Sequence, residues 1–160
     1  MKKAKSLFLI SAIILITFFV SKYCFQLCLI HGNSMEPAYH SWQLALIDKR
    51  GGAPKAGTVV AIKSDVLNAT IVKRVVAVPG DTLLIRDGTL YVNGQKSTAV
   101  SPTAYYEDAG IAATAILLKE EEYFVLGDNC AESVDSRSES VGPISASDIL
   151  GIIIPQHAPR

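Results

Sequence analysis

TIVKRVVAVPGD, residues 70–81, predicts a β-strand that ends in a tight turn. Most of its residues are β-branched or apolar, as strands favour, and the Pro-Gly-Asp at its end is a strong turn signal. A strand has a period of two, so Ile71, Lys73 and Val75 share one face while Arg74 lies on the other. The stretch therefore predicts a β fold in which one strand face carries a lysine among apolar side chains.

Short strands separated by turn residues continue on both sides of this stretch. They are predicted at residues 43–48, 58–62, 82–86, 89–92, 121–126 and 149–154. The runs 82–86 and 89–92 form a predicted hairpin, whereas residues 97–118 predict an irregular surface excursion. The chain is therefore predicted to be mainly β, with a compact, partly closed antiparallel domain that leaves few strand edges exposed.

An apolar segment precedes this domain. Residues 6–25 contain few polar side chains, and a helix needs about 20 apolar residues to cross the hydrocarbon layer. Lysines concentrate before the segment, which predicts a cytoplasmic N-terminus. We expect a cytoplasmic tail at residues 1–5, a single transmembrane anchor at residues 6–28 and an extracytoplasmic domain at residues 29–160. A cleaved secretory signal is the alternative, but no small-x-small pair follows the apolar core.

Composition and charge argue against several classes of protein. The formal net charge is zero, but residues 1–30 carry four lysines and no acid, whereas the remainder has 11 basic and 15 acidic side chains. A mildly acidic domain argues against nucleic acid as a partner. The three cysteines form neither a Cys-x-x-Cys pair nor an even disulfide framework, so a zinc ribbon is not expected.

GNSMEP, residues 32–37, follows the apolar segment and places the hydroxyl of Ser34 near the expected membrane surface. On these six residues alone an ordinary turn is the simpler interpretation, because Gly, Asn, Ser and Pro are common turn residues. A serine nucleophile needs a neighbouring base. His31, His40 and His157 fit surface positions better, because none lies on a strand that would fix its orientation.

Lys73 is a stronger candidate for that base. Burial among apolar side chains disfavours the charged ammonium and lowers its pKa towards a value at which it accepts a proton. Arg74 cannot take this role, because a guanidinium stays protonated. The pattern fits equally well a lysine that protects an edge strand from aggregation. A Ser–Lys dyad is an established variant of the Ser–His–Asp arrangement.

A third polar stretch, GDNCAESVDSR at residues 127–137, follows a predicted strand and is expected to form an ordered loop at the end of the sheet. It lacks the glycine and the distal glutamate of a calcium loop. We therefore expect no metal and no cofactor. For Cys130, within this stretch, the default expectation is a small buried apolar side chain.

Together these stretches resemble the type I signal peptidase family of membrane-anchored Ser–Lys proteases. Residues 32–37 resemble its nucleophile box, and KRVVAVPGD, residues 73–81, resembles its lysine box and is the most specific match. Residues 90–94 are similar to the hairpin that follows in the family, and residues 127–137 resemble its last box. The boxes occur in the family's order.

The resemblance implies a serine endopeptidase that removes signal peptides from secreted precursors. Ser34 matches the nucleophile and Lys73 the general base, and the backbone N–H of Ser34 would contribute to the oxyanion hole. Ser133 matches a serine that orients the lysine amine, and Asp135 and Arg137 match a supporting polar pair. The implied substrates have small residues at the first and third positions before the cut. The implied location is the outer face of the bacterial plasma membrane, against the lipid bilayer.

The chain departs from the family pattern in the last box, at residues 130–132 and 138–140. Gly32 stands where some members add a serine hydroxyl, and other members carry glycine there too. A compact chain with a divergent last box also resembles relatives that mature pilin-like subunits in conjugative transfer, which is the alternative function. Remoter alternatives are a self-cleaving repressor of the SOS-response type, which the apolar N-terminus disfavours, and a non-catalytic anchored β domain that binds an envelope partner.

Overall fold

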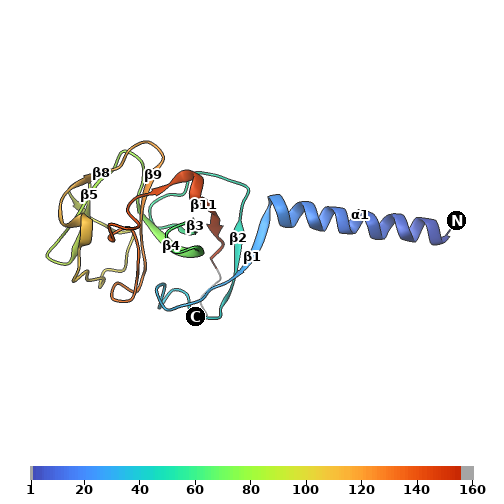
Figure 1. The fold of residues 1–160 in the computed structure, drawn as a ribbon, viewed down its shortest axis with the longest axis horizontal. Coiled ribbons are helices and arrows are strands. Elements are labelled where there is room, and N and C mark those ends of the chain that lie inside the picture. Colours follow the sequence, from blue (N-terminus) through green and yellow to red (C-terminus); the bar gives the residue numbers. More distant parts are fainter. Residues whose placement is uncertain (1, 156–160) are drawn as a thin grey trace.

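The computed structural model describes residues 2–155, in which one long helix is followed by two antiparallel β-sheets. The helix, α1 (Lys2–Tyr23), projects away from the body that the strands form (Figure 1). The strands are β1 (Phe25–Leu29), β2 (Leu44–Asp48), β3 (Val59–Ser64), β4 (Ala69–Ala77), β5 (Thr82–Arg86), β6 (Thr89–Val92), β7 (Gln95–Lys96), β8 (Ile116–Leu117), β9 (Glu122–Leu126), β10 (Ile144–Ser145) and β11 (Ile149–Ile153). Two 3₁₀ turns, η1 (Gly110–Ala113) and η2 (Ala146–Asp148), lie between strands.

Seven strands form the larger sheet, in the order β1-β2-β11-β3-β4-β9-β10, and four form the smaller one, in the order β7-β6-β5-β8. All paired strands are antiparallel. Neither sheet closes on itself, since each ends in two different strands. The prediction of a mainly β, partly closed antiparallel domain is therefore confirmed.

Strand β4 lies in the middle of the larger sheet, between β3 and β9. Lys73 is opposite Val60 of β3, and Arg74 is opposite Leu126 of β9. Both neighbours of β4 are hydrogen-bonded strands, so the interpretation of Lys73 as an edge-strand charge is wrong. The first two residues of β4 are exposed, whereas Lys73 and residues 75–77 are buried, and Val75 packs in an apolar cluster with valines and isoleucines of the neighbouring strands.

Three apolar clusters form the core. One of them lies beneath the segment that joins β1 to β2 and contains Ile30, Met35 and Tyr39 of that segment. These side chains pack on residues of β2, β3 and β11. Burial of the segment's apolar side chains fixes its path over the sheet.

The predicted strands occur within one or two residues of their expected bounds, with three differences. Strand β1 was not predicted, because residues 25–28 were assigned to the end of the anchor segment 6–28. Strand β3 continues through Ser64, two residues beyond the end predicted at residue 62. The excursion at residues 97–118 contains η1 and the short β8. Cross-strand pairing with β2 explains β1, since the apolar run alone does not distinguish helix from strand.

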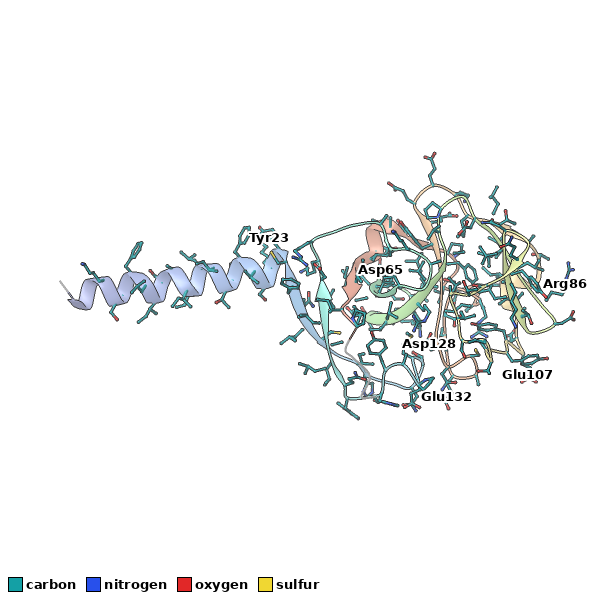
Figure 2. All side chains as sticks on the ribbon, turned by 180° about the vertical axis from the view of Figure 1, so that it is seen from behind. Tyr23, Asp65, Arg86, Glu107, Asp128 and Glu132 are labelled. Atoms are coloured by element: carbon teal, nitrogen blue, oxygen red, sulfur yellow. The ribbon has the colours of Figure 1, made fainter. Side chains whose placement is uncertain are left out.

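Helix α1 stands apart from the rest of the described chain. Its apolar side chains extend outwards around the helix without a neighbouring element (Figure 2). Within residues 2–155 it is the one helix long and apolar enough to cross a membrane, with a candidate span at Lys5–Tyr23. Lys22, at its last turn, lies over the rings of Phe18 and Tyr23. This arrangement is typical of a lysine that extends towards a membrane surface.

Candidate functional site

Ser34 lies in the segment that connects β1 to β2. Backbone hydrogen bonds close this segment at its base, from Ile30 to Gln43 and from Trp42 to Ile30. Within it, Glu36 N–H donates to the carbonyl of Asn33, which forms a tight turn around Ser34. Met35 is buried beneath this turn, so the adjacent Ser34 is held at the surface of the apolar cluster. We call residues 32–37 the nucleophile loop.

Lys73 reaches this loop from strand β4. Its Nζ donates a hydrogen bond of 2.8 Å to Oγ of Ser34. The lysine is 3% exposed, and this burial lowers its pKa below the ordinary value, because an apolar environment disfavours the ammonium. The charge of Asp135 acts in the opposite direction. The structure therefore brings the predicted pair of Ser34 and Lys73 into hydrogen-bond contact, with the pKa of the lysine lowered by burial.

The loop after β9 lies against the nucleophile loop. Asn129 N–H donates to the carbonyl oxygen of Ser34 across 3.0 Å, and Asn129 Nδ2 donates to the carbonyl oxygen of Asn33 across 3.3 Å. Gly127 lies so close that a Cβ there would be 2.5 Å from the carbonyl oxygen of Ser34 and 2.2 Å from Oγ of Ser133. Only glycine fits this position without displacing the backbone.

Ser133 and the ion pair of Asp135 with Arg137 belong to the same loop after β9. The Oγ of Ser133 is buried and has no hydrogen-bond partner among the described residues. Asp135 is 1% exposed, accepts a hydrogen bond from Gly127 N–H and pairs with Arg137 Nε at 2.9 Å. Arg137 also donates to the carbonyls of three residues, Asp108, Cys130 and Ser133. The pair thus fixes the backbone of the loop that contains Ser133.

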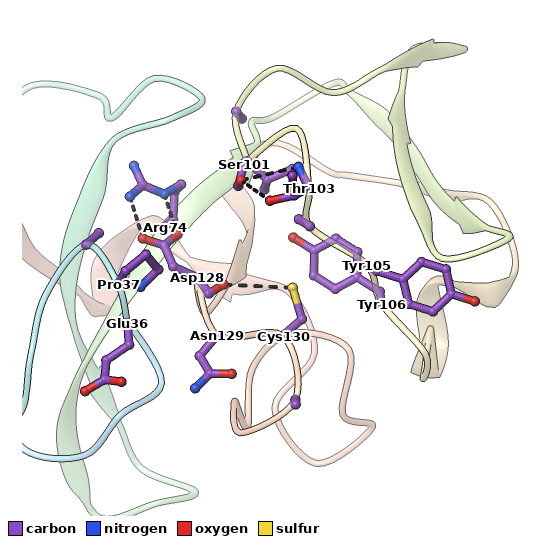
Figure 3. A pocket seen from close by; sticks show the side chains of 15 residues that line it. Glu36, Pro37, Arg74, Ser101, Thr103, Tyr105, Tyr106, Asp128, Asn129 and Cys130 are labelled. Atoms are coloured by element: carbon purple, nitrogen blue, oxygen red, sulfur yellow. Dashed lines mark hydrogen bonds and ion pairs between the residues drawn. The ribbon is translucent and has the colours of Figure 1, made fainter.

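Arg74, on the opposite face of β4 from Lys73, pairs with Asp128. Nε and Nη2 of Arg74 each donate to one carboxylate oxygen of Asp128 at 2.6 Å, and Nη1 donates to the carbonyl of Gly57. The ion pair borders a cavity of about 740 Å³ that also touches residues 36–38, 99–101, 103–106 and 129–131. Figure 3 shows Tyr105 and Tyr106 on the other side of this cavity. The cavity therefore adjoins both loops that hold Ser34.

The signal peptidase family, described as peptidase S26, matches residues 3–155 of this chain. The chain belongs to the signal peptidase family. The chain is 32% identical to signal peptidase I of Bacillus licheniformis over 148 residues, which cover 86% of this chain and 79% of that protein. It is 30% identical to signal peptidase I T of Bacillus subtilis strain 168 over 86% of this chain and 76% of that protein. Membership of this family makes the chain a serine endopeptidase that removes signal peptides.

A crystal structure of a signal peptidase I from Enterococcus faecalis V583 has a similar fold. The TM-score is 0.51 at 28% sequence identity, and the match covers 64% of this chain and 98% of that structure. Together with α1, the family membership indicates a membrane-anchored signal peptidase.

The described histidines of this signal peptidase form no hydrogen bond with Ser34 or Lys73. The ring of His31 packs edge-on against Trp42, and Nδ1 of His40 lies 3.4 Å from a carboxylate oxygen of Glu36. His157 lies outside the described residues. Cys130 is half-buried and packs against an apolar cluster, as a small apolar side chain would. Among residues 2–155, no group of three or more His, Cys, Asp or Glu is placed to hold a metal ion.

Two features of the site were not predicted from the sequence. One is the contact of Asn129 with the nucleophile loop, and the other is the ion pair of Arg74 with Asp128. The alternation of β4 placed Arg74 on the face opposite Lys73, but the position of Asp128 depends on how β9 pairs with β4. A carboxylate two residues after the end of a predicted strand was the available signal for this ion pair.

Proposed function

We propose that Ser34 and Lys73 are the catalytic dyad of this signal peptidase. The observation that carries this assignment is the 2.8 Å contact between Lys73 Nζ and Ser34 Oγ in a site where the lysine is almost fully buried. Burial lowers the pKa of Lys73, so its amine can exist without a proton nearer to neutral pH. The neutral amine then accepts a hydrogen bond from the hydroxyl of Ser34, which is the geometry of a general base and its nucleophile.

Cleavage then follows in two steps. Lys73 takes the proton of Ser34, whose Oγ attacks the scissile carbonyl, and the oxyanion forms beside the N–H of Ser34. The carbon–nitrogen bond breaks as the ammonium of Lys73 returns the proton to the leaving amine. A water molecule, deprotonated by the neutral amine, hydrolyses the acyl-enzyme and regenerates Ser34. Because the mechanism needs neutral Lys73, kcat/KM falls at low pH.

Supporting roles fall to three residues of the loop after β9. We assign to Ser133 the orientation of the Lys73 amine during catalysis, because its buried Oγ has no other hydrogen-bond partner among the described residues and is available to the amine. Asp135 and Arg137 hold that loop through their ion pair and through the Gly127 N–H. None of the three needs to exchange a proton for this role.

The substrates are precursors with small residues at the first and third positions before the cut. The family supports this preference, and so does the packing next to Ser34, where Ile30 and Met35 are 4% and 1% exposed. A methyl side chain rests against such a packed surface, whereas a long side chain would have to displace it. The cavity between the nucleophile loop and residues 99–106 offers space for a further part of the precursor.

The peptidase domain works on the outer face of the plasma membrane. Lysines in the first turns of α1, ahead of its apolar run, support a cytoplasmic N-terminus, and the residues after Tyr23 then lie outside, with Ser34 close to the lipid surface. Anchoring brings the site near the apolar segment of a membrane-bound precursor and raises its effective concentration. We propose the bounds 1–5, 6–28 and 29–160 for tail, anchor and domain; in this division the last residues of the anchor segment form most of strand β1, which pairs with β2 of the domain.

Incubation of the purified full-length chain with candidate precursors, followed by mass determination of the products, tests this function. The panel contains secretory precursors and a pilin-like precursor, so that it separates general secretion from conjugative transfer. We expect cleavage after a small residue, and none with Ser34→Ala or Lys73→Ala. Near-normal cleavage by Lys73→Ala in a folded protein would exclude the dyad, and products of unchanged mass with every precursor would exclude the activity.

A further inference from the structure

One side chain outside the nucleophile loop holds the peptide unit between Asn33 and Ser34. The carbonyl oxygen of this unit accepts a hydrogen bond from Asn129 Nδ2 at 3.3 Å. The carbonyl of the next unit accepts one from Asn129 N–H at 3.0 Å. Asn129 therefore contacts both peptide units that flank the proposed nucleophile.

The first of these units also carries the N–H of Ser34. In a trans peptide the C=O and N–H bonds lie in one plane and point in opposite directions, so fixing the Asn33 carbonyl also fixes the direction of the Ser34 N–H. Within residues 2–155, this N–H donates to no acceptor. It is therefore available for the negative charge that develops on a scissile carbonyl.

A second donor to the Asn33 carbonyl has a different effect. Glu36 N–H donates to the same oxygen at 3.1 Å, but Glu36 belongs to the loop and moves with it. Asn129 follows β9, which pairs with the strand that carries Lys73. The Asn129 contact thus fixes the position of the Asn33–Ser34 peptide unit relative to Lys73. A hydrogen bond between two residues of the nucleophile loop cannot fix this position.

We propose that Asn129 is a positioning residue that aims the backbone N–H of Ser34 into the oxyanion hole. The inference rests on the proposed role of Ser34 as nucleophile. Asn129 has no hydrogen bond to Lys73, so its loss changes the stabilisation of the oxyanion and leaves the pKa of the base unchanged. Since Asn129 also borders the cavity beside the loop, direct contact with substrate is the competing role, and it would affect KM instead.

Steady-state kinetics of the full-length chain in detergent micelles test the proposal, with a precursor peptide that has alanine at the first and third positions before the cut. For Asn129→Ala we expect kcat to fall about fivefold to tenfold, with KM within about twofold and the acid limb of kcat/KM unmoved. Asn129→Asp, similar in size but without the donor, should lose more. Glu132→Gln, an exposed change in the same loop, is the matched control and should behave like wild type.

The amide NMR signal of Ser34 provides a readout that does not depend on cleavage. Asn129→Ala should shift or broaden this signal, and Glu132→Gln should not. An unchanged Ser34 signal in Asn129→Ala overturns the proposal, and so does an unchanged kcat in Asn129→Asp. A loss in Asn129→Ala that appears in KM or as a displaced pH profile also overturns it. If wild type cleaves no precursor, the proposed function fails, and the Ser34 signal alone then decides whether Asn129 holds this peptide unit.

Discussion

Lys73 Nζ donates a 2.8 Å hydrogen bond to Ser34 Oγ, although the two residues are 39 positions apart in the chain. Lys73 is buried in the middle of the larger sheet, and among the described residues no carboxylate lies within ion-pairing distance of its amine. A charged amine in such a place opposes folding. The fold therefore keeps this lysine at a cost in stability, as active sites commonly do.

Replacing Lys73 by methionine should abolish processing and stabilise the fold. Burial lowers the pKa of Lys73 below 10.5, so between the lowered pKa and 10.5 the unfolded chain binds a proton that the folded chain does not. Stability of the wild type therefore rises with pH through this window. We expect Lys73→Met to raise the free energy of unfolding by about 1 kcal/mol at pH 7 and by less at pH 10. Urea denaturation at both pH values measures this.

The control for this prediction is Lys63→Met, because Lys63 is exposed on the neighbouring strand β3. It should leave both activity and stability near those of wild type. A stability gain in Lys73→Met that is the same at pH 7 and pH 10 would contradict a lowered pKa as its cause.

Much of this site is predictable from the sequence, because its main features depend on residue patterns within single segments. The alternation of a single strand placed Lys73 and Arg74 on opposite faces, and turn residues placed Ser34 in a tight loop. The edge or central position of β4 was not predictable, because strand order depends on contacts between distant segments. Strand β1 was likewise not predictable, since its apolar residues continue the pattern of the preceding helix.

Removing the Ser133 hydroxyl should separate activity from stability. Its Oγ is buried without a partner, so folding pays for its lost hydration and gains no hydrogen bond in return. We expect Ser133→Ala to raise the free energy of unfolding by up to about 1 kcal/mol and to lower kcat by about tenfold or more, because the Lys73 amine loses its orientation. Thermal unfolding and steady-state kinetics test the two effects. Full activity in Ser133→Ala would exclude the orienting role.

Arg74 and Asp128 should be energetically coupled. Their side chains are 20% and 13% exposed and share two hydrogen bonds, so removing either partner leaves a largely buried charge. We expect Arg74→Met and Asp128→Asn each to cost about 2 kcal/mol of stability, with the double variant costing less than their sum. A double-mutant cycle in urea gives the coupling energy.

The exposed ion pair of Lys63 with Asp65 is the comparison for that cycle. Its coupling energy should be below about 0.5 kcal/mol, because water screens both charges. Equal coupling in the two pairs would show that burial does not strengthen the Arg74–Asp128 contact.

Gly127→Ala should damage activity more than stability. A Cβ there would lie 2.5 Å from the Ser34 carbonyl oxygen, so the two loops must separate. A shift approaching 1 Å in the nucleophile can cost about 100-fold in kcat. Gly142→Ala is the matched control, because Gly142 has φ +61° but open space around it. Gly142→Ala should lose about 1 kcal/mol of stability and keep its activity. Equal kcat in the two variants would exclude the close approach of Gly127 to Ser34 as the cause of the lost activity.

Gly32→Ser should lower activity, although some signal peptidases carry a serine hydroxyl at this position. Gly32 has φ +91°, which side chains of L-residues rarely adopt, and its N–H donates to Oγ of Ser41 at 3.1 Å. A serine here has open space around its Cβ, so the penalty comes from the backbone, about 1 kcal/mol or more. The loop would relax by rotating the peptide next to Asn33 and turning the Ser34 N–H away from the oxyanion.

Kinetics of Gly32→Ser and Gly32→Ala test this prediction. We expect similar losses of kcat in both variants, since the backbone strain is the same. A kcat above wild type in Gly32→Ser alone would show instead that the new hydroxyl reaches the oxyanion.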